Sequence, residues 1–209
     1  MKTLLVMTAT LGIAAGAFAQ GKVTIINDNS HLLKYSSSTA DLRPADAALA
    51  GASVASPSGI NASWAMQLYG NPSATATQGM LAALGTWANA GGPVAGRFSG
   101  VALTLPTGYP GGPVAATVPA SFQVRLWEKT ANNYTSFEAA KASGLAYYAM
   151  TPVFTMNPGP ASANSIVAGG TPSFSTWAAG DIVALVPEPA SASIIGLGLA
   201  SLLIFRRRK

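Results

Sequence analysis

The eight residues Ser121–Glu128, SFQVRLWE, decide the fold class of this chain. Their alternation places Phe122, Val124 and Leu126 together on the inner face of a β-strand. The residues expected on the outer face are Gln123, Arg125 and Trp127. This stretch is the clearest of several predicted strands, which together indicate a mainly β protein.

Other segments have the alternation or the β-branched composition of strands. They are Lys22–Asn27, Ser63–Tyr69, Leu145–Phe154 and Asp181–Val186. Within the second of them, Trp64, Met66 and Leu68 fall on one face. Residues 36–62 are rich in Ser, Ala and Gly, and they predict a long loop with little regular structure.

A five-residue repeat lies between the predicted strands Ser63–Tyr69 and Ser121–Glu128. Gly-Gly-Pro-Val-Ala occurs at residues 91–95 and again at 111–115. Two copies are too few for a solenoid, so we interpret them as similar turns that flank a strand pair around Arg97–Leu105.

One helix is expected after the central strand. Thr135 fits the N-cap of a capping box with Glu138 as its third helical residue, and Gly144 is a natural stop. Short strands, Gly/Pro turns and this helix of about two turns predict an antiparallel β-sandwich, with a flattened barrel as the alternative.

The composition limits the function classes. The chain has 209 residues, which suits one main domain, and only 9% of them are charged. Between residues 20 and 186 the charges nearly cancel, because the cations there are Lys22, Lys34, Arg43, Arg97, Arg125, Lys129 and Lys141 and the anions are Asp28, Asp41, Asp46, Glu128, Glu138 and Asp181. The net charge of +5 therefore comes from the two ends, and the interior shows no basic patch that indicates nucleic-acid binding.

The first residues have the three parts of an export signal. Lys2 gives a positive start, Leu4–Ala15 forms an apolar helical segment, and Ala17 and Ala19 supply the small side chains that a signal peptidase requires. We expect cleavage after Ala19, which leaves Gln20 as the first mature residue. The segment is short for a membrane span.

Residues 186–209 have the composition of a membrane-targeting segment. Ala190–Phe205 has no charge, and as a helix its sixteen residues would be about 24 Å long, against about 27–30 Å for the hydrocarbon of a bilayer. The cations expected to hold its end in the cytoplasm are Arg206, Arg207, Arg208 and Lys209. Pro187 and Pro189 disfavour a helix, so Val186–Pro189 is expected to be extended and open to a processing enzyme.

Pro187-Glu188-Pro189, the short apolar span and the Arg cluster together resemble the PEP-CTERM sorting signal of Gram-negative bacteria. The resemblance implies that a membrane enzyme, an exosortase, cleaves the tail and that the protein passes to the cell surface or an exopolysaccharide matrix. The residues assigned to the signal are Val186, Pro187, Glu188, Pro189, Arg206, Arg207, Arg208 and Lys209. The rest of the chain is more loosely similar to uncharacterised PEP-CTERM proteins of the Verrucomicrobia type, which brings no known activity. The alternative is an ordinary single-span anchor that is never cut.

Three parts of the chain are therefore expected. They are a signal peptide with its helix at residues 1–19, an exported β-rich domain at 20–185, and a sorting signal with a transmembrane helix and basic tail at 186–209.

The central domain carries little that indicates catalysis. The chain has no cysteine, and its one histidine, His31, lies in a polar turn where we expect it at the surface. No Gly-x-Ser-x-Gly elbow, calcium-loop spacing or clear carboxylate pair is present. We predict no catalytic, cofactor-binding or metal-binding residue, so the chain is expected not to be an enzyme.

The outer face of the central strand offers one contact surface. Trp127 with Gln123 and Arg125 has the chemistry to stack on and hydrogen-bond a sugar, unless the helix or a loop covers it. The leading expectation is a non-enzymatic cell-surface or matrix protein. Its expected partners are signal peptidase, an exosortase-type enzyme, the membrane through the tail, and exopolysaccharide. A carbohydrate-binding module is the first alternative, and a secreted hydrolase that uses His31 or a carboxylate pair is the second.

Overall fold

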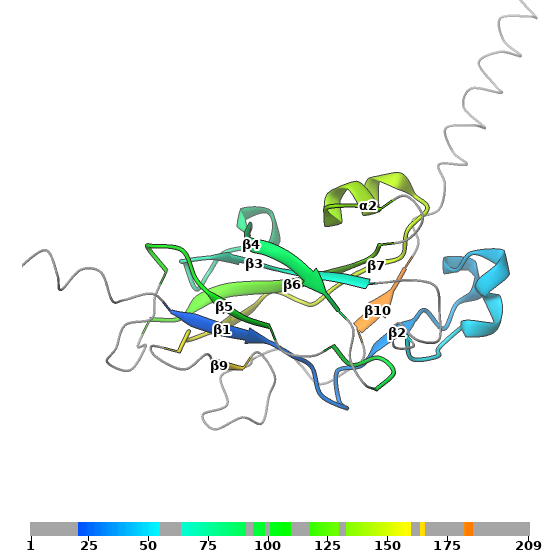
Figure 1. The fold of residues 1–209 in the computed structure, drawn as a ribbon, viewed down its shortest axis with the longest axis horizontal. Coiled ribbons are helices and arrows are strands. Elements are labelled where there is room, and N and C mark those ends of the chain that lie inside the picture. The colour runs from blue at the N-terminus through cyan, green and yellow to red at the C-terminus, as the bar shows by residue number, and fades with distance from the viewer. Residues whose placement is uncertain are drawn as a thin grey trace, which may run out of the picture.

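The structure is a computed structural model that describes residues 21–54, 64–90, 94–98, 101–109, 118–129, 133–159, 164–165 and 182–185. The strands are β1 (Lys22–Ile25), β2 (Leu33–Tyr35), β3 (Trp64–Asn71), β4 (Ala82–Asn89), β5 (Val101–Thr104), β6 (Ala120–Glu128), β7 (Tyr148–Met150), β8 (Phe154–Met156), β9 (Asn164–Ser165) and β10 (Ile182–Ala184). The helices are α2 (Phe137–Ser143) and the short 3₁₀ turns η1 (Thr39–Asp41), η2 (Pro44–Leu49) and η3 (Gln78–Met80). The protein is mainly β with one α-helix in the described part, as its sequence predicts (Figure 1).

The largest sheet is antiparallel and has β6 at its centre. Its order is β4-β3-β6-β7, and β8 also pairs with β6. β3 and β6 are in unbroken register from Trp64 opposite Glu128 to Asn71 opposite Ser121. The predicted strand SFQVRLWE is thus the central strand of the sheet, and β3, β7 and β8 all pair with it.

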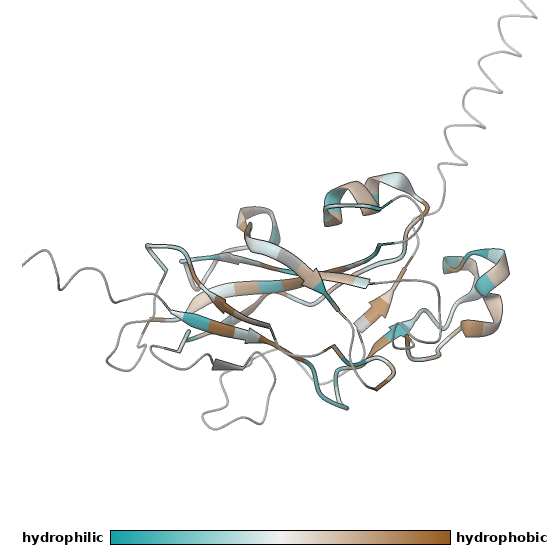
Figure 2. Cartoon of the chain, in the orientation of Figure 1, coloured by the Kyte–Doolittle hydropathy of each residue, from teal (hydrophilic) through white to brown (hydrophobic). Residues whose placement is uncertain are grey.

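Two smaller sheets lie on one side of the large one. β1 pairs antiparallel with β5 and parallel with β9, while β2 pairs parallel with β10. Figure 1 shows these strands running below the large sheet, with α2 on its opposite face. Hydrophobic and hydrophilic residues alternate along β1 (Figure 2), where Val23 and Ile25 are buried. The alternation therefore directs the apolar side chains of β1 toward the large sheet.

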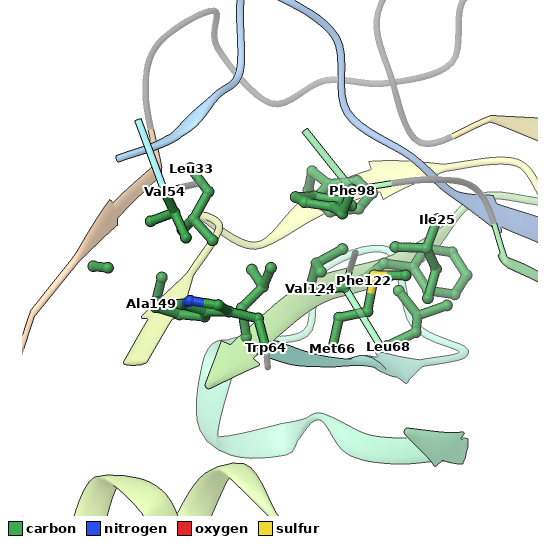
Figure 3. Packing of buried hydrophobic residues seen from close by; sticks show 14 of the residues in the cluster. Ile25, Leu33, Val54, Trp64, Met66, Leu68, Phe98, Phe122, Val124 and Ala149 are labelled. Carbon is green, nitrogen blue, oxygen red and sulfur yellow. The ribbon is translucent and has the colours of Figure 1, made fainter. Parts of the chain in front are cut away.

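The main core fills the space between these layers. Trp64, Met66 and Leu68 project from β3 toward Leu33, Val54 and Phe98 (Figure 3), and the shared face predicted for the three β3 residues is confirmed. Phe122 and Val124 extend the same layer from β6. A second, smaller cluster lies under α2 and comprises Ala65, Trp127, Phe137, Ala140 and Ala146. β6 is consequently buried along its whole length.

Several sequence expectations differ from the structure. Leu145–Phe154 is not one strand, because β7 and β8 are separated at Thr151–Val153, where Pro152 has no amide hydrogen to donate. The expected strand pair around Arg97–Leu105 is, in the described residues, the single strand β5, which pairs with β1. The long loop predicted at 36–62 contains η1 and η2, and Ser53 bridges to Lys34. The sequence reading also missed β4.

The predicted targeting segments lie outside the described residues. This holds for Ala17, Ala19 and Gln20 and for the sorting signal from Val186 onward, and also for the second Gly-Gly-Pro-Val-Ala copy. Among the helices that are described, none has the length and apolar character needed to cross a bilayer.

Candidate functional site

The predicted sugar-contact face of β6 is buried under α2. Trp127 is 0% exposed, and its indole Nε1 donates a hydrogen bond to the Tyr134 carbonyl at 3.1 Å. Its ring packs with Phe137 and Ala140 of the helix. The sequence left two positions open for Trp127, an exposed sugar contact or a place covered by the helix or a loop. The structure shows the second, because α2 covers this face of the strand.

Arg125 and Gln123, the other two predicted contact residues, are also buried. The Arg125 guanidinium lies 3.8 Å from the centroid of the Tyr69 ring, and its Nη1 donates to Glu138 Oε1 at 2.9 Å. Its Nε donates to Gln123 Oε1 at 2.9 Å, and Gln123 Nε2 donates to the Thr151 carbonyl at 2.8 Å. The polar groups considered for a sugar contact therefore hold α2 and the β7 end of the sheet in place.

Tyr69 forms a second link between the sheet and Glu138 of α2. Its hydroxyl donates to both Glu138 oxygens, at 2.9 and 3.0 Å. Burial, followed by the hydrogen bond to Glu138, raises the pKa of Tyr69 to about 12. The phenol is therefore neutral and remains a donor across the ordinary pH range.

The local sequence explains why α2 begins where it does. Ser136, and not Thr135, is the N-cap, since its Oγ accepts from the Ala139 amide at 3.1 Å. Glu138 is then in the first turn and reaches Arg125 and Tyr69 on the sheet. Gly144 ends the helix with φ 65°, a left-handed conformation that glycine adopts without strain.

A second charged network joins the 3₁₀ turns to β6. The Arg43 guanidinium donates to both oxygens of Glu128, at 3.1 and 2.8 Å, and its Nε donates to Asp46 at 2.7 Å. Glu128 is 1% exposed and also accepts from the Tyr147 amide at 3.2 Å. The Tyr147 hydroxyl donates to Asp46 at 3.0 Å. This carboxylate pair is occupied by internal donors, so the geometry does not favour glycoside hydrolysis.

Tyr35 packs against the same network. Its ring meets Tyr147 edge-on at 5.0 Å between centroids. Burial, with the charges of Glu128 and Asp46, raises the pKa of Tyr35 to about 12. The network thus keeps a neutral phenol beside two carboxylates.

The third polar cluster surrounds His31. Its Nδ1 lies 2.7 Å from Asp28 Oδ1, which also accepts from the Ser30 amide at 2.8 Å. Burial acts to raise the pKa of Asp28. The hydrogen bonds to His31 and Ser30 act in the opposite direction, and the net result is a pKa below the ordinary value. His31 is 1% exposed, so the expected surface position is wrong, and its ring does not reach a substrate in solvent.

Asn27 explains why His31 is enclosed. Its Nδ2 donates to the carbonyls of His31 at 2.7 Å and Gly96 at 2.8 Å, and its Oδ1 accepts from the Phe98 amide at 2.7 Å. The Asn27 side chain therefore ties the turn after β1 to residues 69 and 71 positions later, so the His31 cluster connects loops.

No metal site is apparent in the part of the chain that the structure describes, where no three His, Asp or Glu residues gather. Sequence reasoning missed both ion-pair networks. The available signal was the sparseness of charge, because an apolar chain that retains Arg43, Arg125 and Glu128 in or near its core has to pair them.

Comparisons with known proteins gave no relative. No family model matches the chain, and no curated protein or solved structure matches it.

Proposed function

We propose that this chain is an exported, non-enzymatic protein of the cell surface or extracellular matrix, held in the membrane temporarily by residues 186–209. The export pattern at residues 1–19 and the Pro-Glu-Pro, apolar and basic pattern at 187–209 support this proposal. The processing enzyme is of the exosortase type, and the released domain joins the cell surface or an exopolysaccharide matrix.

The observation that carries the proposal is the position of the last described strand. β10 pairs with β2, and the next residue, Leu185, exchanges two backbone hydrogen bonds of 3.0 Å with Tyr148. Val186, the first residue of the sorting pattern, follows at once. Cleavage within 186–209 would therefore leave the described pairing of β10 and Leu185 in place, as a domain released by processing requires.

The use of the charged side chains supports a non-enzymatic role. Arg43, Asp46 and Glu128 form one internal network, and Arg125 and Glu138 form another. Both networks join an outer helix or turn to β6, so their evident task is to hold the domain together.

The proposal includes a finer description of the fold as an antiparallel β-sandwich. The support is that the main core takes side chains from β3, β6 and β8 on one side and from β1, β2 and β10 on the other. Two layers of strands with an apolar core between them are the arrangement of a sandwich.

The experiment replaces Pro187, Glu188 and Pro189 together by alanine in the host cell and follows the protein by fractionation. We expect the variant to remain in the membrane fraction at precursor length, while the unaltered protein reaches the surface in shortened form. Lys141→Ala, on an exposed position of α2, serves as the control and should be sorted normally. Normal shortening of the triple variant would refute processing through this tripeptide.

A further inference from the structure

Strand β4 forms an open end of the large sheet. Within the described residues it pairs with β3 alone, over Ala82–Leu84 and again over Ala88–Asn89. Its solvent-exposed residues are Ala82, Ala83, Gly85, Thr86 and Asn89. An edge strand presents a row of backbone donors and acceptors that a second strand can satisfy.

The opposite end of the sheet is closed. Leu185 exchanges two hydrogen bonds with Tyr148 of β7, and α2 packs its Phe137 ring against the Tyr148 ring at 5.7 Å. The two ends of one sheet therefore differ, and in the part of the chain that the structure describes β4 is the end left available for pairing.

β4 lacks the side chains that commonly protect an edge. Its sequence, AALGTWAN, contains no Lys, no other charged residue and no proline. The neutral region is much wider, because no charged residue occurs from Ala47 to Gly96. Met80, just before the strand, is 57% exposed. Two copies of this surface can thus approach without like-charge repulsion.

A bulge limits how much of the edge can pair. Gly85, Thr86 and Trp87 stand opposite the single residue Gln67, and Gly85 has φ 65°. Gln67 Nε2 donates to the Gly85 carbonyl at 2.8 Å, so this acceptor is already used inside the chain. Only the short regular segments on either side remain, and a contact between them should be weak and reversible.

We propose that β4 is a self-association edge at which two copies of this chain pair their β4 strands antiparallel about a two-fold axis. A two-fold contact needs no second, complementary surface, because each copy presents the same residues to the other. The side chains described as exposed on β4 are small and uncharged, and this edge pairs with no other strand in the described residues, which suits an identical strand better than a charged partner. The inference does not depend on whether residues 186–209 are cleaved.

The absence of cysteine makes a direct test possible. Ala83→Cys places a thiol on β4, and Ala139→Cys places one at an equally small, exposed position on α2. Each full-length variant is purified in detergent and treated with a short bis-maleimide. We expect the β4 variant to form dimers about tenfold faster, because paired edges raise the effective concentration of the two thiols.

A blocking variant completes the test. Thr86→Lys, added to Ala83→Cys, places like charges across the edge and should reduce the cross-linking rate to that of the Ala139→Cys control. Circular dichroism checks that the lysine variant is folded. Equal rates for the two cysteine positions, absence of cross-linked dimer, or an unchanged rate with lysine in a folded protein would overturn the proposal.

Discussion

At the scale of single residues, stability depends on a few charges paired inside an apolar protein. Glu128 is 1% exposed and accepts hydrogen bonds from Arg43 and the Tyr147 amide. A buried carboxylate that loses its cation is left with an uncompensated charge, which destabilises the folded state more strongly than loss of a surface pair.

Arg43→Met should therefore lower the free energy of unfolding by about 2–3 kcal/mol, somewhat below the range for fully buried pairs because the Arg43 side chain is 36% exposed. Adding Glu128→Gln should restore part of the loss, since it removes the buried charge. Urea unfolding at neutral pH measures both effects. Lys141→Met, at an exposed position of α2, is the control. If Arg43→Met lowers the free energy of unfolding no more than this control does, Arg43 does not compensate a buried charge on Glu128.

The pH dependence of stability provides a second test at this scale. Tyr35 has a pKa of about 12 in the folded protein, above the ordinary value of 10. The folded state holds this proton when the unfolded state has lost it, so the contribution is complete below pH 10 and is lost as the pH rises to 12. Tyr35→Phe should reduce the slope of stability against pH in this window by up to about 1.4 kcal/mol per pH unit. Parallel curves for the two proteins would show that Tyr35 is not shifted.

At the scale of elements, α2 is the structure that sequence reasoning placed well but interpreted incompletely. Its position and its Gly144 stop were predicted, whereas the cap is one residue later than expected. Thr135 and Ser136 both have hydroxyls, and the pattern alone does not decide between them. The two candidates give different expectations on mutation.

Ser136→Ala should lower the free energy of unfolding by about 1 kcal/mol, because it leaves the Ala139 amide without its acceptor. Thr135→Ala, a change of similar size one residue earlier, should lower the free energy of unfolding by only about 0.3 kcal/mol. Thermal or urea unfolding compares the pair. A larger loss for Thr135→Ala would restore the cap that the sequence predicts.

The strands show what alternation can and cannot predict. β3 and β6 follow it, and their inner faces were predicted correctly. Whether a second layer covers the other face of β6 is not encoded in the strand, so the pattern left open whether Arg125 and Trp127 lie in solvent, and α2 buries them. β4 was missed because Ala and Gly have low strand propensity and its bulge interrupts the period. The Arg43–Glu128 pair spans 85 residues and has no local signal.

At the scale of the whole molecule, β10 is the last strand that the structure describes. It lies beside β2, and Leu185 bridges to β7, so this short segment connects a small sheet with the large one. Residues that join the layers in the described part of the chain therefore lie directly before the proposed sorting signal.

Two truncations test this boundary. A chain of residues 20–185 should keep cooperative thermal unfolding, because the contacts described for β10 remain. A chain of residues 20–180 loses the buried Ala184 and the pairing with β2, and it should unfold at a clearly lower temperature. Equal melting temperatures would show that β10 does not contribute to the fold.

The most direct measurement for the protein as a whole is the intact mass of the molecule recovered from the surface of its own cells. We expect the mass of a chain that begins at Gln20 and lacks Arg206–Lys209. Export followed by removal of a temporary membrane anchor requires this product. A molecule recovered there with Lys209 still attached would contradict that processing and leave a permanent anchor as the explanation.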